Sequence, residues 1–573
     1  MSFKSLIDEI ENNIHKILDD LSVSGILFSV EPAKPGFGDV SSNVSFLLAK
    51  HLKKNPKDVA DILSEKYRQF SSTLVSNVES HPSGYLNFFA NWEKLNQLIL
   101  SESNLDEFGS VDLGKNSTIV VEHTSVNPNK ALHIGHIRNI VLGDIIAKIL
   151  KKSNYKVNIL NYVDDSGLQV ADIIVGFRHF GFSQQPPQGK KFDHYCGDDV
   201  YVKTTEKYEN DPSLEEIRKN ILKELEDGNS EIAQFADKIT RRVLENQLET
   251  CWNLGVYYDC LNFESQIIRS GLWGKIFEKL KEMSLIEFEN EGKNIGCWVI
   301  RGENAEEDKV IVRSNGTATY IAKDIPYAAW KLGLLEDPFN YQKYDKIQPG
   351  NHILWQTTLV DSVEPKQNFT GKKVITVIDS RQARLQKIIT TLMSKFKSTE
   401  DAYVHLGYES VTLSADTAQT LGLNTDGKQA QMSGRKGLYV NADSVYDLLK
   451  NKIIEETTKR HPEMADYEIE KIAHHVSVGT LRYEMIKQDL DKIITFDLTK
   501  SLSLEGDTAP YIQYSYARAS RIIEKSTRTP SIDVDFSLLN DLSELELIKT
   551  IGLFDIHVMD AAKNLSPKVI ARY

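Results

Sequence analysis

The chain has 573 residues, of which 41% are hydrophobic and 26% are charged, and its formal net charge is −13. A globular chain of this length exceeds one hydrophobic core and predicts about three or four domains. The sequence shows no N-terminal signal pattern and no apolar run near the roughly 20 residues that cross a bilayer, so we expect a cytoplasmic protein without membrane contact.

Residues 1–110 combine helical and strand patterns. Helical spacing covers residues 3–21 and 41–67, and short strand-like apolar runs lie between and after these segments. The polar stretch 106–116 contains two glycines and is typical of a linker. We therefore predict a separate N-terminal α+β domain.

Residues 111–440 predict a Rossmann-like domain built on a parallel sheet. Apolar runs at 118–123 and 156–163 flank a segment with helical periodicity, which is the pattern of one βαβ unit. Further strands of the same sheet are expected at 309–313 and 373–378. This order of elements predicts a multidomain α/β protein.

Two stretches differ from this α/β pattern. Residues 183–302 contain a charged helical stretch and a polar hairpin-like segment, and we interpret them as an insertion within the parallel-sheet domain. Residues 441–573 show no strong strand signal but have long helical periodicity at 466–491 and 511–523. We predict an all-helical C-terminal domain there.

His133-Ile134-Gly135-His136 stands where the first predicted strand ends and its helix begins. Free backbone N–H groups and the helix dipole favour an anion at this place, and Gly135 leaves room for a phosphate. Two alternatives fit the spacing: the histidines could form half of a metal site, or could be plain polar residues at a helix start. The four cysteines contain no Cys-x-x-Cys pair, which argues against a structural zinc site and a disulfide framework.

A polar set of residues precedes the two histidines. Glu122, Ser125, Asn127 and Lys130 fall at the end of the strand and in the loop after it. Ligands bind at the carboxyl end of the strands in an open parallel sheet. A carboxylate and an amide suit a cationic substrate and Lys130 suits a phosphate, although a polar loop covering a sheet edge explains the pattern equally well.

Tyr320 and Asp324 form a second candidate pair. Residues four apart on a helix share one face, so this phenol and carboxylate could meet one ligand. A planar guanidinium could bond the acid. An amphipathic surface helix accounts for the same spacing.

The segment 431–437 is a third candidate, because small residues there stand beside two adjacent cations. Met432 and Ser433 precede Arg435 and Lys436. Such a loop suits a mobile clamp on a polyphosphate that stabilises charge in a transition state. A solvated basic turn is the simpler alternative.

With these residues in view, the chain resembles the arginyl-tRNA synthetases, a family of class I aminoacyl-tRNA synthetases. His133-Ile134-Gly135-His136 matches the His-x-Gly-His signature of class I, and the context from Val121 to Asn139 resembles the arginyl version. Three further stretches match in the same order, and Gly38-Asp39-Val40 and Gly84-Tyr85-Leu86-Asn87-Phe88 resemble the family's N-terminal extension. The three stretches are Asn161 to Gln169, Asp379-Ser380-Arg381-Gln382, and Glu505 to Tyr514.

The resemblance implies roles for the matched residues. The ATP phosphates would be bound by His133 and His136, and adenine or ribose would lie close to Gly135. The segment 431–437 would be the second class I signature, in which Met432, Ser433 and Arg435 contact ATP and Lys436 supplies catalytic charge. The arginine pocket would consist of Glu122, Ser125, Asn127, Tyr320, Asp324 and Gln382.

The sequence departs from the family pattern in two places. Gln431 and Gly434 stand where the second signature usually has lysines, and arginyl enzymes are thought to replace the second of these with the lysine ahead of the histidines, here Lys130. Lys130 is therefore a catalytic candidate. The segment 565–573 ends within a helix pattern that continues in the family, so we expect a truncated anticodon-binding domain.

The resemblance implies an arginine–tRNA ligase that uses ATP and Mg²⁺. L-arginine would be activated to arginyl-adenylate with release of pyrophosphate and then transferred to the 3′-terminal ribose of tRNA(Arg), by positioning and charge stabilisation alone. The N-terminal domain would touch the tRNA elbow, and the protein would be a monomer without a structural metal. Two alternatives stay open: another adenylate-forming nucleotidyltransferase, and a catalytically impaired or truncated tRNA-binding relative.

Overall fold

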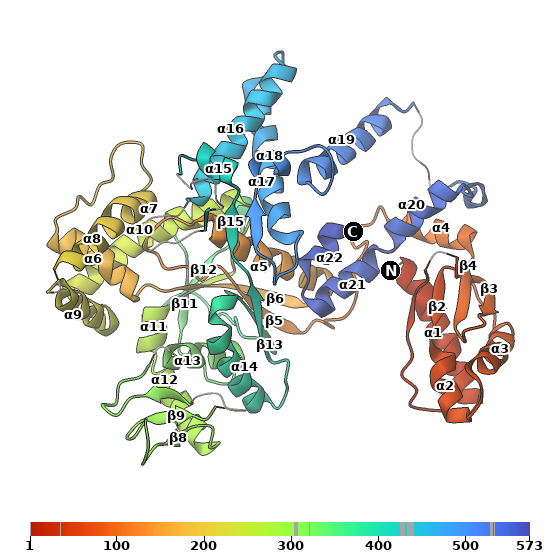
Figure 1. Ribbon diagram of the computed structural model, residues 1–573, viewed down its shortest axis with the longest axis horizontal. Helices are drawn as coiled ribbons and strands as arrows, with labels where there is room; N and C mark the ends of the chain where they lie inside the picture. The colour runs from red at the N-terminus through yellow and green to blue at the C-terminus, as the bar shows by residue number, and fades with distance from the viewer. Residues whose placement is uncertain are drawn as a thin grey trace.

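The computed structural model describes residues 2–34, 36–211, 213–302, 308–319, 321–423, 430–431, 440–527, 531 and 533–573. Figure 1 shows a small N-terminal domain at one end, a central sheet with its covering helices, and the helices of the C-terminal third beside both. Among the helices in these ranges, none is both long and apolar enough to cross a membrane.

The N-terminal domain is an antiparallel sheet in the order β1-β2-β4-β3 with helices packed against it. In its first helix Ile10, Ile14 and Ile17 recur every three or four residues and are buried, as an amphipathic helix requires. Its elements are α1 (Ser2–Asp20), β1 (Val30–Pro32), β2 (Val40–Ser42), α2 (Val44–Leu52), α3 (Pro56–Tyr67), β3 (Val75–Ser80), β4 (Leu86–Ala90) and α4 (Trp92–Glu102).

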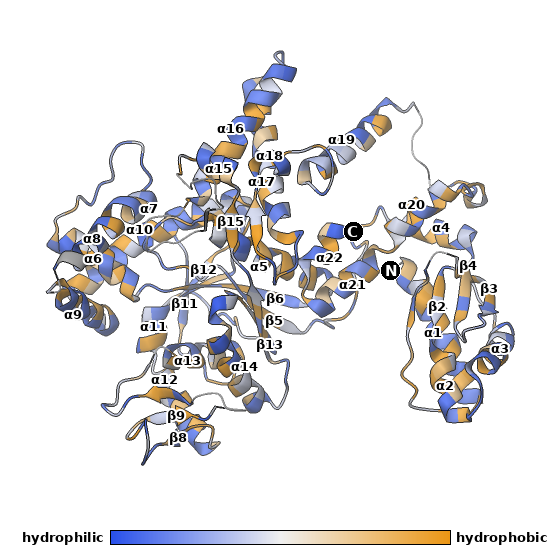
Figure 2. Ribbon diagram, viewed as in Figure 1, coloured by the Kyte–Doolittle hydropathy of each residue, from blue (hydrophilic) through white to orange (hydrophobic). Residues whose placement is uncertain are grey.

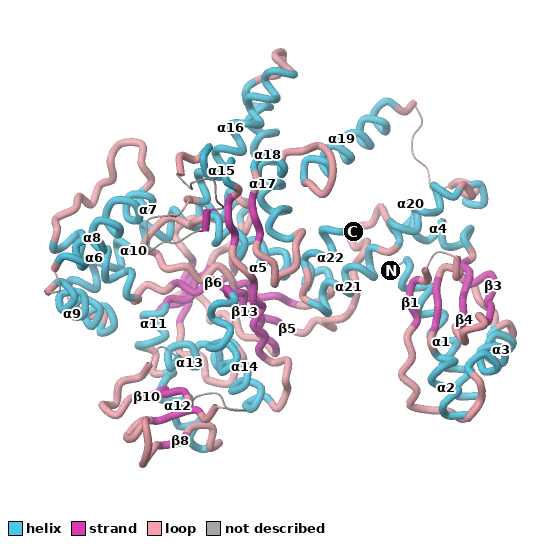
Figure 3. The backbone as a smooth tube through the Cα atoms, in the orientation of Figure 1, coloured by secondary structure: helices cyan, strands magenta, loops and turns pink. Residues whose placement is uncertain are grey.

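The central sheet has seven strands in the order β11-β12-β7-β6-β5-β13-β14 (Figure 3). Every neighbouring pair is parallel except β11 with β12. The strands are β5 (Thr118–Glu122), β6 (Lys156–Val163), β7 (Cys260–Phe263), β11 (Asn340–Lys343), β12 (Trp355–Thr358), β13 (Lys373–Asp379) and β14 (Tyr403–Tyr408). From β5 the chain adds β6 and β7 on one side of this strand, and it later adds β13 and β14 on the other side. The direction in which strands are added therefore reverses between β5 and β13.

Helices cover both faces of this sheet. Val121 belongs to the core that contains α5 (Ile134–Lys152), and its neighbour Val120 belongs to the core that contains α13 (Ile321–Lys331) and α14 (Ala383–Lys397). Alternate residues of a strand face opposite sides, so a strand covered on both faces is a continuous apolar run. In Figure 2 the hydrophilic α9 (Leu214–Asp227) contrasts with this apolar interior.

The prediction of one insertion at 183–302 is wrong, because β7 lies inside that range and is a central strand of the sheet. The chain instead leaves the sheet twice. The first excursion is a helical subdomain with its own core. Its helices are α6 (Leu168–His179), α7 (Phe192–Tyr195), the π-helical turn η1 (Cys196–Tyr201), α8 (Val202–Asn210), α9 and α10 (Glu231–Asn253).

The second excursion corrects another expectation. Residues 309–313 were predicted to rejoin the parallel sheet, but β10 (Lys309–Val312) pairs with β9 (Trp298–Ile300) in a separate antiparallel sheet with β8 (Glu287–Phe288). A four-residue apolar run carries no information about its pairing partner, which is why the prediction failed. The helices α11 (Glu264–Arg269) and α12 (Leu272–Glu282) precede this sheet.

The C-terminal third is mainly helical, as predicted, but it contributes one short strand. β17 (Ile494–Phe496) pairs in parallel with β15 (Val411–Leu413), which also pairs with β16 (Ala430–Gln431). The helix α15 (Ala415–Thr420) lies between β15 and β16 in sequence. The later helices are α16 (Ala442–Arg460), α17 (Asp466–Ile486), α18 (Leu498–Ser501), α19 (Ala509–Lys525), α20 (Leu542–Gly552), α21 (Phe554–Asn564) and α22 (Pro567–Arg572).

Candidate active site

The candidate site lies where the strand order reverses, between β5 and β13. Immediately after β5, Thr124 and Ser125 adopt positive φ angles of 74° and 46°. Two amides hold this unusual backbone: Thr124 N–H donates to Asn139 Oδ1 on α5, and Ser125 N–H donates to Asn161 Oδ1 on β6 at 3.1 Å. The polar loop predicted after β5 is therefore fixed to the sheet at the position where open α/β folds bind ligands.

His133 and His136 stand at the start of α5 and stack on each other, with ring centroids 3.5 Å apart and ring planes 17° apart. The backbone N–H of His133 donates to His136 Nδ1 at 3.2 Å, which places the proton of a neutral His136 ring on Nε2. A Cβ on Gly135 would lie 3.0 Å from the His133 ring, so this position favours glycine. The sequence predicted this grouping of the three residues.

Both histidines are held neutral. Burial, together with the charges of Lys130 and Arg381, lowers the pKa of His133 to about 4. Burial also lowers the pKa of His136 well below its usual value. His133 Nδ1 is buried and has no hydrogen-bond partner among the described residues. A pair of neutral imidazoles at a helix N-terminus can donate hydrogen bonds to a phosphate without bringing a charge of their own.

Lys130 is 8% exposed and burial lowers its pKa. Its ammonium lies 5.1 Å from the centre of the Tyr201 ring, which belongs to the helical subdomain. The backbone of the loop is fixed by Gln247 on α10, whose Nε2 donates to the carbonyls of Lys130 at 2.8 Å and of Asn127 at 3.1 Å. The helical subdomain therefore supports the loop that carries the predicted catalytic lysine.

Glu122 ends β5 and is almost fully buried, at 4% exposure. Its Oε1 accepts a hydrogen bond from Ser125 Oγ at 3.2 Å, as expected for two members of one pocket. Its other oxygen pairs with Lys331 at the end of α13, a residue that sequence reasoning did not identify.

Asp324 lies on α13 beside other acids. Burial, together with the charges of Glu264 and Glu122, raises its pKa to about 7. Asp164, which accepts a hydrogen bond from Asn127 Nδ2 at 2.7 Å, has a pKa well above its usual value because of burial and the charges of Glu264 and Asp165. The structure thus brings Asn127 and Asp324 to one acidic cluster, which we define as Asp164, Glu264 and Asp324.

Glu264 is the member of this acidic cluster that sequence reasoning missed. It directly follows β7 and accepts hydrogen bonds from Ser166 Oγ at 2.7 Å and Tyr162 OH at 2.8 Å, both from β6 or the loop after it. Lys323 lies 3.3 Å from the same carboxylate. The signal that could have identified Glu264 is its position at the carboxyl end of a central strand, which the predicted insertion concealed.

The other predicted residues are less fully described. Gln382 is exposed and ends the turn η3 (Ser380–Gln382), on the β13 side of the point where the strand order reverses. Beside it Arg381 pairs with Asp379 at 2.7 Å. Six predictions fall outside the described residues: Tyr320, Met432, Ser433, Arg435, Lys436 and the fold of the loop that contains the last four.

Within the described ranges, the signature histidines do not belong to any group of residues that could hold a metal ion. The one group of three close ligands found there is Asp193, His194 and Asp443, which includes neither signature histidine. Lys191 Nζ lies 2.7 Å from Asp443 Oδ2, and His194 Nε2 contacts the same oxygen at 3.0 Å. These contacts lower the pKa of the Asp443 carboxyl although burial opposes them, so a cation from the protein already occupies this group.

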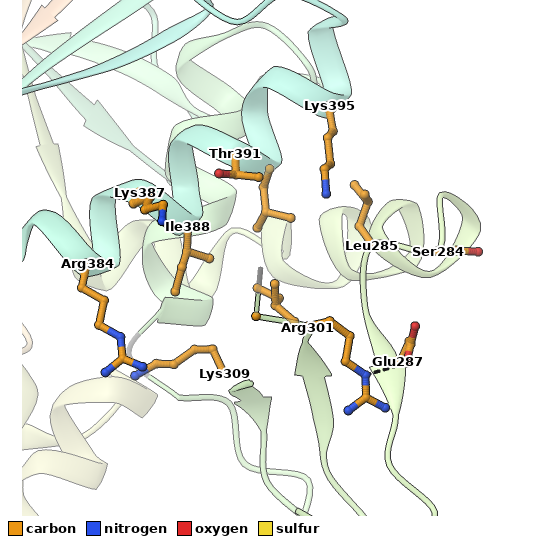
Figure 4. Close-up of a pocket in the computed structure, with 13 residues that line it drawn as sticks. Ser284, Leu285, Glu287, Arg301, Lys309, Arg384, Lys387, Ile388, Thr391 and Lys395 are labelled. Atoms are coloured by element: carbon orange, nitrogen blue, oxygen red, sulfur yellow. Dashed lines mark hydrogen bonds and ion pairs between the residues drawn. The ribbon is translucent and has the colours of Figure 1, made fainter. Parts of the chain in front are cut away.

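A separate cavity of about 150 Å³ lies between α14 and the β8–β10 sheet (Figure 4). Basic side chains dominate its lining, including Lys309, Arg384 and Lys387, while Arg301 pairs with Glu287. Of the predicted site residues that the structure describes, none lines this cavity. We therefore place the candidate active site at the strand reversal and not here.

Family models match three parts of the chain. Residues 95–338 match the catalytic domain described as "tRNA synthetases class I (R)", residues 4–90 match the "Arginyl tRNA synthetase N terminal domain", and residues 512–573 match the "DALR anticodon binding domain". The parallel sheet, its reversal point and the paired histidines are thus those of a class I aminoacyl-tRNA synthetase.

Comparison with individual proteins identifies the family within this class. The arginine–tRNA ligase of Thermococcus sibiricus is 34% identical over 96% of this chain and 87% of its own, and that of Thermus thermophilus is 33% identical over 98% and 89%. The solved Thermus thermophilus arginyl-tRNA synthetase superposes with a TM-score of 0.82 at 31% identity, covering 99% of this chain and 90% of that one. This chain belongs to the arginyl-tRNA synthetase family. The fold class and the ligase activity predicted from the sequence are confirmed.

Proposed function

We propose that the chain binds L-arginine and Mg²⁺·ATP at the strand reversal and joins them into arginyl-adenylate and pyrophosphate. The observation that supports this proposal is the acidic cluster. Asp164 follows β6, Glu264 follows β7 and Asp324 lies on α13. A guanidinium presents planar, paired N–H donors that match their carboxylates. Lysine has no such fork and would leave acceptors unpaired, which gives selectivity.

The ATP phosphates would bind on the side of the loop after β5 that faces away from the acidic cluster. Neutral His133 and His136 would face the phosphates from the start of α5, and Lys130 would add a cation. Asp379 is a carboxylate close enough to His133 to act on its pKa, but it is already paired with Arg381. We therefore propose that Mg²⁺ binds as a complex with the ATP phosphates and not to this carboxylate. We extend the proposal to Met432, Ser433, Arg435 and Lys436 as further ATP contacts.

No protein nucleophile is required. The arginine carboxylate attacks the α-phosphate, the bond to the β-phosphate breaks, and pyrophosphate leaves with the electron pair. The protein contributes position and charge: the acidic cluster holds the side chain, and the histidines and Lys130 hold the phosphates. The arginyl group then passes to the 3′-terminal ribose of tRNA(Arg).

We further propose that the chain is divided into three functional regions. Residues 1–110 would contact the tRNA elbow, residues 111–440 would carry out catalysis, and residues 441–573 would contact the anticodon. In this scheme Gln382 and Tyr320 complete the arginine pocket, and the protein acts as a monomer in the cytoplasm.

The test is arginine-dependent exchange of pyrophosphate into ATP, measured on the full chain with and without tRNA(Arg). Exchange that requires arginine supports the proposal, and substitution of arginine by lysine should abolish it. Exchange supported by other amino acids would favour a different adenylate-forming enzyme. Absence of exchange with both tRNA and arginine, together with arginine binding in calorimetry, would favour an idle tRNA-binding relative.

A further inference from the structure

The backbone of residues 130–134 carries two of the proposed phosphate contacts, Lys130 and His133. We call these five residues the anchored segment. The segment lies between the loop after β5 and the first turn of α5, outside any regular strand. Its backbone N–H and C=O groups are therefore not all satisfied by a strand or helix of its own, and other elements must bond them where they are buried.

The helical subdomain bonds the first two residues of the anchored segment. The N–H of Ala131 donates to the carbonyl of Asp193 on α7 at 3.1 Å. The carbonyl of Lys130 accepts a hydrogen bond from Gln247 on α10 at 2.8 Å. Two helices of one subdomain thus set where the backbone of the lysine lies.

The start of α16 bonds the remaining residues of the anchored segment. Ile134 N–H donates to the carbonyl of Val440 at 3.1 Å, and Ala442 N–H donates to the carbonyl of Leu132 at 2.7 Å. These bonds pair the anchored segment with residues 440–442 in an antiparallel bridge. The backbone of the anchored segment is therefore fixed by α7, by α10 and by the start of α16.

A single carboxylate joins these three elements to one another. Asp443, the second residue of α16, accepts a hydrogen bond from Thr250 Oγ1 on α10 at 2.8 Å. Its other oxygen lies 2.7 Å from Lys191 Nζ, just before α7, and 3.0 Å from His194 Nε2 on α7. His194 makes a second link to the same end of α16, because its Nδ1 lies 3.1 Å from Asn441 Nδ2.

Asp443 is mostly buried, with 20% of its side chain exposed. Burial acts to raise the pKa of its carboxyl, but the hydrogen bond from His194 and the charge of Lys191 outweigh burial and hold the pKa below its usual range. The carboxylate is therefore charged at neutral pH. Hydrogen bonds to a charged acceptor are shorter and stronger than neutral ones, so the junction is firm.

We propose that Asp443 is a positioning residue for the phosphate side of the site: it ties α7, α10 and the start of α16 together, and thereby holds the anchored segment so that Lys130 and His133 stay in place around the ATP phosphates. This inference rests on the proposed function. It adds to that function a residue that acts on ATP through the backbone of another segment and does not touch it.

A purely structural role for Asp443 is the competing explanation. An acid in the first turn of a helix stabilises that helix through the helix dipole, whatever the helix packs against. In that case the loss of Asp443 would lower the melting temperature and leave the kinetics of ATP unchanged. The informative quantity is therefore kcat/KM for ATP, compared with the Kd for arginine and with the melting temperature.

Two variants and one control separate the explanations. Asp443→Asn keeps the size of the side chain but removes its charge. Thr250→Val removes only the bond from α10 in a side chain of the same shape, and it decides the question if the first variant does not fold. Asp172→Asn is the control, because Asp172 on α6 forms a buried ion pair with Arg218 on α9 at 2.8 Å in the same subdomain.

The measurement is arginine-dependent exchange of pyrophosphate into ATP on the full chain, with arginine binding followed by calorimetry. For Asp443→Asn we expect kcat/KM for ATP to fall about 10- to 100-fold, because small displacements of positioning groups cost that much. Thr250→Val should lower it about 3- to 10-fold, the effect of one hydrogen bond. The arginine Kd should stay within about twofold of wild type in both variants, as for sites without shared contacts.

The Asp172→Asn control should lose stability and keep kcat/KM for ATP within about twofold of wild type. A wild-type kcat/KM for ATP in Asp443→Asn or Thr250→Val would overturn the inference alone. The same follows if the control loses as much kcat/KM for ATP as Asp443→Asn, or if arginine binding weakens as strongly as ATP use. Absence of arginine-dependent exchange in the wild-type chain would instead overturn the proposed function, and the inference with it.

Discussion

At the scale of single residues, the carboxyl group of Asp324 makes arginine binding depend on pH. Its pKa is raised to about 7 by burial and by Glu264 and Glu122. As the pH falls through about 7 the group takes up a proton and loses the charge that a guanidinium needs. We expect the arginine Kd to fall as the pH rises from 6 to 8, and binding near pH 7 to release a proton.

Calorimetry in buffers of different ionisation enthalpy measures both quantities. Asp324→Asn should weaken arginine binding about 10- to 100-fold and reduce the dependence on pH, since one charged hydrogen bond contributes roughly 1.5–3 kcal/mol. Glu226→Gln is the matched control, because this half-exposed acid pairs with Lys323 outside the acidic cluster. A Kd that stays constant between pH 6 and 8 would contradict the role of Asp324.

Residues that lie within one short loop could be grouped from the sequence, and residues that meet across the sheet could not. Glu122, Ser125 and Asn127 stand close to His133 in the chain, so the pattern alone groups them. Lys331 and Glu264 reach the same pocket from distant positions, through the order of strands and the end of a helix. Their side chains carry no local pattern, and only tertiary pairing places them there.

At the scale of elements, the contact between α5 and β5 positions the histidines. Gly143 in the middle of α5 lies directly against His123, so that a Cβ there would overlap the His123 ring. The ring is completely buried and also packs against Tyr258 at 5.1 Å between centroids. The helix can approach the strand this closely only because residue 143 has no side chain.

Gly143→Ala should therefore displace α5 and cost about 1–3 kcal/mol of unfolding free energy, as overpacking in a rigid core does. Denaturant unfolding measures this cost, and ATP binding should weaken with it. Gly274→Ala in α12 is the matched control, because a Cβ there meets nothing within 4 Å. That change should stabilise the protein by about 0.5–1 kcal/mol through helix propensity. Equal effects at the two positions would contradict the close contact.

Elements were predictable in proportion to their length. The long periodic helices α5, α17 and α19 are where the sequence places them, because ten or more residues define an apolar face, and so is the eight-residue strand β6. β7 and β10 have four residues each. A run of that length fits a strand in either sheet, so the pattern could not distinguish the central strand from the excursion.

At the scale of the whole molecule, the C-terminal helices join the N-terminal domain to the catalytic sheet. Ala561 and Ala562 on α21 pack against Ile149 on α5. The other side of α21 meets the first domain, where the Lys4 backbone N–H donates to Asp555 Oδ2 at 3.2 Å. Ile548 on α20 is buried in the core of the N-terminal domain. The chain ends thus meet beside the signature helix.

Phe554 is the side chain at the centre of this junction. Its ring stacks on Phe108 at 5.9 Å and on Tyr573 at 5.2 Å between centroids. It also covers Gly109 so closely that a Cβ there would overlap the ring. The segment that links the first domain to the sheet is therefore held by contacts with other elements and not by its own secondary structure. These contacts are the aromatic one and backbone hydrogen bonds from Val111 to Lys152 and from Gly114 to Ser153.

We predict that Phe554→Ala separates tRNA-dependent steps from small-molecule binding. Removing the ring should cost about 1–3 kcal/mol, since Phe554 is only partly buried, and loosen the linker around residues 103–117, which limited proteolysis would detect as new cleavage. Arginine and ATP should bind as in the wild type, because the strand reversal is untouched, while the KM for tRNA rises. Lys549→Ala removes a partly buried ion pair with Asp39 at 3.3 Å in the same junction. It should change both quantities less than Phe554→Ala does, since pairs that solvent still reaches contribute about 0–1 kcal/mol. If Phe554→Ala instead weakened arginine binding as strongly as tRNA binding, the junction would be part of the fold of the active site, and the N-terminal domain could not be regarded as a tRNA-contacting part held at a distance.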